Sequence, residues 1–121
     1  MDDPEEHALV VKALQDGLSN CVIWHEKGAR LVREDPELQG LTPASLRRAV
    51  IDFVRNQADA AAAVKQVPEQ REQWRDQYRF YYRVILPVTG FRHGLFVEMR
   101  LTDDDQEFPG VTIVRAHTQR K

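Results

Sequence analysis

Apolar and polar residues alternate along the C-terminal third of the chain, beginning at Tyr78. Every even position from Tyr78 to Val88 is apolar or aromatic, whereas the odd positions include Arg79 and Arg83. Side chains alternate between the two faces of a strand, so a period of two indicates a strand with one face in the core. The many β-branched and aromatic residues in this run also favour a strand over a helix.

The same alternation recurs twice downstream. The second run places Leu95, Val97, Met99 and Leu101 on one face and Phe96, Glu98, Arg100 and Thr102 on the other. Segments 89–94 and 103–110 both contain glycine and predict the two hairpin connections, the second of them leading into the run Val111–His117. The sequence therefore predicts a meander of three antiparallel strands. The phase of the third strand stays open, because its apolar residues occupy both parities.

Helical patterns precede these strands. Residues 4–17 predict a helix that has Pro4 in its first turn and stops at Gly17. The clearest helix opens with Thr42 as the N-cap and Pro43 at the first helical position, and the alanine-rich stretch 58–64 has the propensity to continue it.

Two segments fit more than one structure. Residues 21–35 fit either a strand Cys21–Trp24 followed by a helix Glu26–Asp35, or a hairpin that turns at Lys27 and Gly28; we favour the strand and helix. Residues 69–77 are strongly polar, and they fit an exposed helical turn or the projecting start of a strand.

These elements predict an α+β fold in which amino-terminal helices pack on an antiparallel sheet of three to four strands. The length of 121 residues favours a single domain over residues 1–121. A three-stranded sheet has exposed edges, which residues 21–24 or a second subunit would cover, so we expect a homodimer through a sheet edge as one arrangement.

Composition and charge narrow the functional classes. No apolar run is long enough to cross a membrane, the segment MDDPEEH is unlike a secretory signal, and the single Cys21 fits a reducing compartment, so we expect a cytoplasmic protein. The net charge is −2, yet 13 of the 17 basic residues are arginine, a side chain suited to bidentate phosphate contacts. No histidine pair has a metal-ligand spacing, so we expect no metal and no cofactor.

The polar face of the predicted sheet carries the candidate chemistry. Cleavage of RNA without a metal needs a base for the 2′-hydroxyl proton, an acid for the leaving oxygen and cations for the phosphate. We assign Glu98 as the base, His117 as the acid, and Arg83 and Arg100 as the phosphate clamp. The substrate-binding candidates are Arg79, Tyr81, Arg115 and His93.

Two further interpretations accompany this assignment. His25 is a second catalytic candidate, although an exposed histidine at a helix start is the ordinary explanation for it. Charges such as those of Glu98 and Arg100 also occur on the solvated face of a sheet, where they form cross-strand ion pairs for stability.

The order of helices followed by RFYYRVILPV, LFVEMRL and VTIVRAH resembles the topology of the barnase-like and RelE-like ribonuclease toxin superfamily, from about Trp24 onward. That resemblance implies a small cytoplasmic ribonuclease, often a toxin neutralised by an antitoxin-like protein partner. The chain shares no sequence motif with that superfamily and is slightly acidic where such nucleases are basic, so no site residue is transferred from it.

The sequence thus supports two hypotheses. The first is a metal-independent endoribonuclease that acts on RNA through the sheet face. The second is a non-catalytic α+β module that binds another protein through its helices or its acidic amino-terminal segment.

Overall fold

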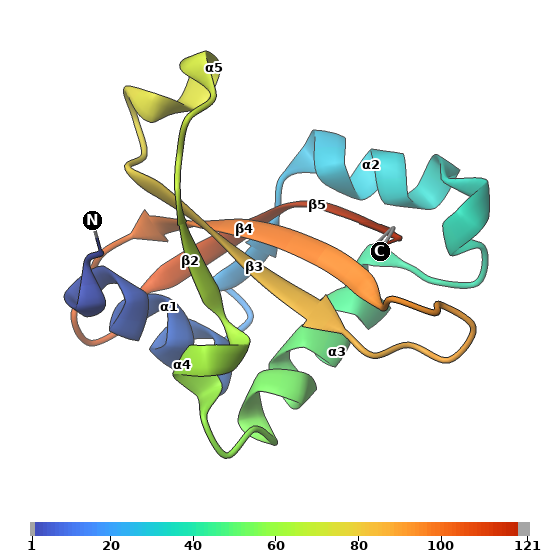
Figure 1. The fold of residues 1–121 in the computed structure, drawn as a ribbon, viewed down its shortest axis with the longest axis horizontal. Helices are drawn as coiled ribbons and strands as arrows, with labels where there is room; N and C mark the ends of the chain where they lie inside the picture. Colours follow the sequence, from blue (N-terminus) through green and yellow to red (C-terminus); the bar gives the residue numbers. More distant parts are fainter. Residues whose placement is uncertain (1, 119–121) are drawn as a thin grey trace.

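A mixed five-stranded sheet with helices on both faces organises the chain (Figure 1). The computed structural model describes residues 2–118. The strands are β1 (Val22–Trp24), β2 (Lys65–Pro68), β3 (Phe80–Leu86), β4 (Leu95–Asp103) and β5 (Gly110–Thr118), in the spatial order β1-β5-β4-β3-β2. The helices are α1 (Pro4–Asp16), α2 (Glu26–Glu34), the 3-10 turn η1 (Pro36–Leu38), α3 (Pro43–Arg55), α4 (Ala60–Ala63) and α5 (Glu72–Arg75).

The predicted α+β class and the antiparallel meander are confirmed, with β3, β4 and β5 as its strands. The strand-then-helix interpretation of residues 21–35 is also confirmed. The expected number of strands is wrong, because the sheet has five. The expectation of a purely antiparallel sheet is wrong as well, because β1 pairs in parallel with β5, Val22 opposite Val111 and Trp24 opposite Ile113.

The segment between α3 and β3 differs most from the prediction. The long helix does not continue through 58–64: α3 ends at Arg55, and Asp59 starts the separate helix α4 by accepting a hydrogen bond from the Ala62 N–H. Lys65–Pro68 then forms the edge strand β2. It has no apolar alternation of its own, so its pairing with β3 is what makes it a strand.

Helices α1, α3 and α4 cover one face of the sheet, and the core lies between them and the strands (Figure 1). Burial alternates along β3, so the even positions face the core as the sequence predicts. The large core side chains from the helices and strands include Leu14, Leu46, Ile51, Tyr82, Leu86, Leu95, Met99 and Ile113. No helix within residues 2–118 is long and apolar enough to cross a membrane.

A β-bulge resolves the phase of β5. Glu98 of β4 pairs with Arg115, but the next residue, Met99, pairs with Ile113, so Val114 is left over. One extra residue reverses the side-chain alternation of a strand. Ile113 therefore faces the core before the bulge and Ala116 faces it afterwards, while Arg115 shares the face of Glu98.

The face opposite the core carries Phe96, Glu98 and Arg100; we call it the open face. Helices α2 and α5 lie over it, α2 against β5 and α5 at the tip of the β2–β3 connection (Figure 1). Gly28 lets α2 approach β5 closely, because a Cβ atom at this position would lie 2.3 Å from the Val114 carbonyl oxygen. The open face is therefore partly covered, and it is buried at its centre.

Candidate functional site

A cleft of about 760 Å³ lies over the open face between α2 and α5. Leu31 of α2 and Trp74 of α5 supply apolar lining, and Glu34 and Asp35 line it as well. The basic side chains in its lining are those of His25, Lys27, Arg100, Arg115 and His117. We call this hollow the α2–α5 cleft.

A buried charge network joins β4 to the residues that follow β2. Its members are Glu69, Arg71, Glu98 and Arg100. Arg71 donates from Nη2 to Glu98 Oε2 at 2.7 Å and from Nε to Glu69 Oε2 at 3.0 Å. Arg100 forms an ion pair with Glu69 and has its Nη1 atom 3.2 Å from Glu98 Oε2. These contacts hold the Arg100 side chain in place. Only 1% of its surface is exposed.

Hydrogen bonds within the network favour the charged forms of Glu69 and Arg71. Burial alone would raise the pKa of Glu69, but hydrogen bonds from Arg100 and Arg71 outweigh burial and hold this pKa below its usual value. Burial alone would lower the pKa of Arg71, but its hydrogen bonds to Glu98 and Glu69 raise it overall. Buried ions are tolerated only when they are paired in this way.

Aromatic rings complete the setting of the two arginines. The Arg100 guanidinium lies 4.5 Å from the Trp74 ring centroid and 5.5 Å from that of Tyr78, and Arg71 lies 4.9 Å from that of Tyr81. These are cation–π distances, which stabilise a desolvated cation. Trp74 is thereby held at the side of the cleft although α5 contains no buried residue.

One hydrogen-bond donor of Arg100 has no acceptor. Its Nε atom is buried and has no hydrogen-bond partner, a property shared among residues 2–118 only with the Nε atom of Arg83. An unsatisfied buried donor costs about 1–3 kcal/mol. Arg100 lines the cleft, so an acceptor that reached this atom from the cleft would remove the cost.

Two histidines line the same cleft from different elements. His25 is the residue before α2, and its backbone N–H donates to the Ile113 carbonyl at 2.8 Å, which ties it to β5. His117 lies beyond the bulge and stacks on Phe96, with ring centroids 4.8 Å apart and an interplanar angle of 18°. Both imidazoles are exposed. The cleft thus joins the predicted acid, His117, to the second catalytic candidate.

Comparison of the chain with protein-family models, with curated proteins and with solved structures finds no match. Among residues 2–118, no three His, Cys, Asp or Glu side chains are grouped so that they would hold a metal ion.

The other predicted site residues lie in several places. Arg115 lines the cleft, is about half exposed and has its Nε atom 3.7 Å from Glu98 Oε1. Glu98 itself is buried among the arginines. Tyr81 lies under Arg71, as described above. Arg83 sits opposite Glu98 in the register but does not belong to the cleft lining.

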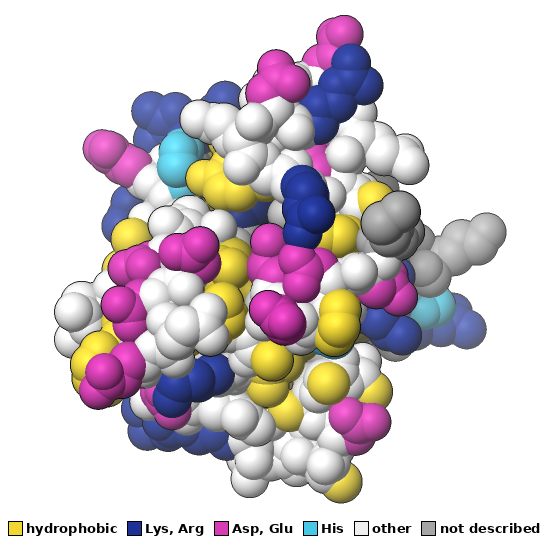
Figure 2. Space-filling view, turned by 90° about the vertical axis from the view of Figure 1, so that its left-hand side faces the viewer, with side chains coloured by type: hydrophobic (Ala, Val, Ile, Leu, Met, Phe, Trp, Pro, Cys, Tyr) yellow, Lys and Arg dark blue, Asp and Glu magenta, His cyan; other side chains and the backbone are white. Residues whose placement is uncertain are grey.

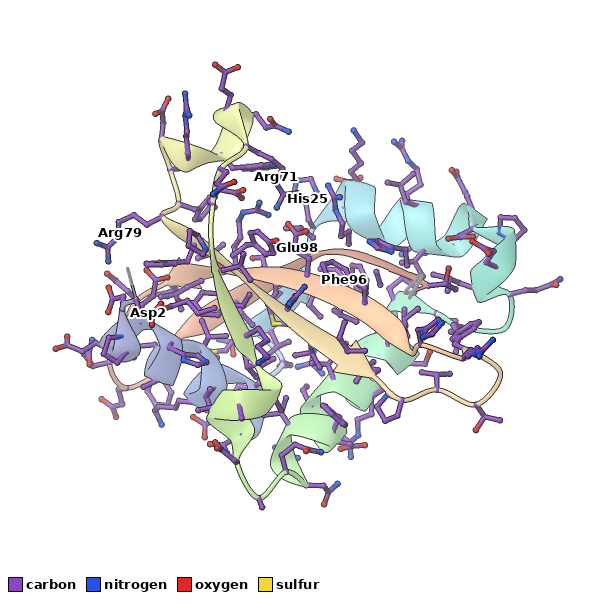
Figure 3. All side chains as sticks on the ribbon, in the orientation of Figure 1. Asp2, His25, Arg71, Arg79, Phe96 and Glu98 are labelled. Atoms are coloured by element: carbon purple, nitrogen blue, oxygen red, sulfur yellow. The ribbon has the colours of Figure 1, made fainter. Side chains whose placement is uncertain are left out.

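Two predicted substrate-binding residues lie away from the cleft. Arg79 forms an ion pair with Asp3, beside the start of α1, at the end of the sheet away from His25 (Figure 3). His93 is exposed in the β3–β4 connection.

Sequence reasoning missed Glu69, Arg71, Lys27 and Trp74 as members of the site. The run EQREQWRDQ has no apolar periodicity, so no pattern marks Glu69 as a buried residue. The one available signal was the pair Glu98 and Arg100 on a single strand face, since a buried arginine next to one carboxylate requires further acceptors.

Proposed function

We propose that this protein is a metal-independent endoribonuclease whose active site is the α2–α5 cleft. The observation that carries the proposal is that His25, His117 and Arg100, whose buried Nε atom has no hydrogen-bond partner, all line one cleft. Imidazole is the side chain best suited to exchange protons near neutral pH, and two of them supply one base and one acid.

The reaction is an internal transfer at phosphorus. One imidazole takes the proton of the RNA 2′-hydroxyl, the O2′–P bond forms, and the P–O5′ bond breaks. The other imidazole gives its proton to the departing O5′ atom, which leaves a 2′,3′-cyclic phosphate and a free 5′-hydroxyl. Negative charge develops on the phosphoryl oxygens during this step, so fixed cations next to them lower the barrier.

Arg100 and Arg115 supply those cations. Glu98 faces both guanidinium groups and holds them in place, and Glu69 holds Arg100 from the other side. The oxygens of Glu98 are occupied by arginine contacts, so we assign it a positioning role and give the base role to a histidine. Pre-organised charges of this kind need no rearrangement when the transition state forms.

Trp74 and Leu31 provide a surface for a base. Aromatic side chains stack on the unpaired bases of RNA, and a ring at the side of the cleft is placed for that contact.

Cleavage of a labelled RNA oligonucleotide tests the proposal. We expect His25→Ala and His117→Ala each to lower kcat by about 10²- to 10⁴-fold. His93→Ala, which changes an exposed loop histidine outside the cleft, is the matched control and should cleave like wild type. A chain of the same sequence in DNA should stay intact. Wild-type protein that leaves RNA intact, or cleavage that survives both cleft substitutions, would end this proposal.

A second candidate function rests on a different surface. Acidic side chains from the start of α1 and from the β4–β5 connection gather on one face (Figure 2), and Glu6, Asp103 and Asp104 line a common hollow there. We propose that this acidic face binds a protein with a basic surface, antitoxin-like or other. If this is the whole function, wild-type protein cleaves no RNA. Any effect of its expression on cell growth would then survive loss of both cleft histidines and disappear when the acidic residues are neutralised.

A further inference from the structure

A second hollow, of about 450 Å³, lies near the other edge of the sheet. Lys65 of β2 and Arg83 and Ile85 of β3 form one wall, and residues of α3, α4 and the segment between them, among them Phe53 and Asp59, form the other. It shares no lining residue with the α2–α5 cleft. Its two cations sit directly opposite each other in the strand register.

The register connects this hollow to the cleft. Lys65 pairs with Arg83, Arg83 with Glu98, and Glu98 with Arg115, so one row of side chains crosses four strands. Residues directly opposite each other share a face of the sheet, which places the whole row on the open face. Three inter-strand steps of about 4.8 Å separate the ends of the row by roughly 14 Å.

The two cations of the hollow are available to bind a further partner. The Arg83 Nε atom is buried without a hydrogen-bond partner, and within residues 2–118 neither Lys65 nor Arg83 is in an ion pair. Asp59 also lines the hollow, but its carboxylate caps α4. Glu98, the neighbour of Arg83 in the row, is already engaged by three other arginines.

A further cation lies beside the carboxylate in the middle of the row. Arg71 bonds to Glu98 from above the sheet, and its side chain is 30% exposed. A polyanionic nucleic-acid chain that leaves the cleft along the row would therefore pass Arg71 before it reaches Arg83.

We propose that the Lys65–Arg83 hollow is a second phosphate-binding subsite, which holds a backbone phosphate of the same RNA strand whose bond is broken in the α2–α5 cleft. This inference rests on the proposed function. At a rise of about 3.4 Å per nucleotide, a 14 Å separation corresponds to roughly four nucleotides in a stacked strand, and to fewer in an extended one. The enzyme would thus prefer oligonucleotides to dinucleotides.

Binding of non-cleavable DNA tests the subsite without catalysis. The probes are single-stranded deoxyoligonucleotides of two and eight nucleotides, and the measurement is the salt dependence of the Kd. Each lost phosphate contact lowers the slope of log K against log salt by about 0.7 for single strands. We expect this loss for the octamer in Lys65→Ala and Arg83→Gln, with no change for the dinucleotide. Arg48→Gln, at an exposed arginine of α3, is the control.

A second measurement guards against variants that fold poorly. In wild-type protein, the Arg83 Nε–H resonance should shift when the octamer is added and stay in place with the dinucleotide. An octamer that fails to bind wild type, or that binds both variants with an unchanged slope, would overturn the subsite. Octamer binding that depends on Lys65 and Arg83, in a protein that cleaves no RNA, would keep the subsite and remove the proposed ribonuclease function.

Discussion

Arg115 of β5 lies opposite Glu98 of β4, with its Nε atom 3.7 Å from Glu98 Oε1. Two residues earlier on the same strand, Ile113 is fully buried in the core. Both placements hold because the bulge at Val114 turns the strand over between them. The arrangement of the proposed site therefore depends on one unpaired residue, Val114.

The close contact between Gly28 of α2 and Val114 at the bulge should contribute to stability. In Gly28→Ala, the new Cβ would meet the Val114 carbonyl oxygen at 2.3 Å, so α2 has to move away from β5. We expect a loss of about 1–3 kcal/mol in the free energy of unfolding, measured by urea denaturation, together with reduced RNA cleavage. Arg30→Ala, at an exposed position of the same helix, should change stability little. A Gly28→Ala variant as stable as wild type would contradict close packing of α2 against β5 at this position.

Removal of the buried carboxylate should be costly. Glu69→Gln leaves Arg100 and Arg71 short of a negative partner in a buried setting, and breaking a buried ion pair costs about 3–5 kcal/mol. Urea denaturation at neutral pH measures this cost. Glu72→Gln changes a neighbouring carboxylate that is almost fully exposed, and serves as the control.

The same pair of proteins should show a defined pH dependence. The folded-state pKa of Glu69 lies below its ordinary value of 4.5, so its stabilisation is complete above about pH 4.5 and is lost as the pH falls through the lowered pKa. The stability difference between wild type and Glu69→Gln should therefore shrink on acidification below pH 4.5. A difference that stays constant down to the acid transition would argue against a charged Glu69.

Trp74 should contribute to substrate affinity. Stacking of a base on an aromatic side chain is worth about 1–3 kcal/mol, so we expect Trp74→Ala to raise the KM for RNA roughly 5- to 150-fold. Trp74→Phe keeps a ring and should recover much of the affinity. Because α5 has no buried residue, the Trp74→Ala variant should remain folded by circular dichroism. Equal KM values for the two variants would show that no base stacks there.

Each edge strand of the sheet has a feature that opposes pairing with a strand of another molecule. The homodimer that the sequence suggests would form through such an edge. Arg47 donates from Nε to the Val22 carbonyl at 2.6 Å on the outer side of β1, and β2 ends in Pro68, which has no N–H. We expect Arg47→Ala to free the β1 edge and to cause concentration-dependent association in analytical ultracentrifugation. Arg48→Ala, one residue along α3, is the control.

The sequence predicts the elements with a strong period and misses those without one. The alternation in β3 and β4 marks core and open face correctly, and the Thr42 cap of α3 is visible from residue types alone. Strand β2 is invisible because it forms only by pairing with β3, and Glu69 is invisible because its burial goes with long-range contacts such as its ion pair with Arg100 of β4.

The same limit applies to the site. Glu98 and Arg100 are adjacent on one strand face, which the period of two predicts. The position of His117 depends on a bulge, and a bulge leaves no fixed signature in a single sequence. The parallel pairing of β1, which brings His25 to the same cleft, is a long-range contact that periodicity does not report.

That parallel pairing has a consequence during synthesis. His25 is fixed by a hydrogen bond to Ile113, so the cleft is complete only after β5 has docked between β1 and β4. A ribosome translates the segment with His25 long before the segment with His117. If the cleft cleaves RNA, the nascent chain stays harmless to the messenger and the ribosome that produce it until β5 is in place.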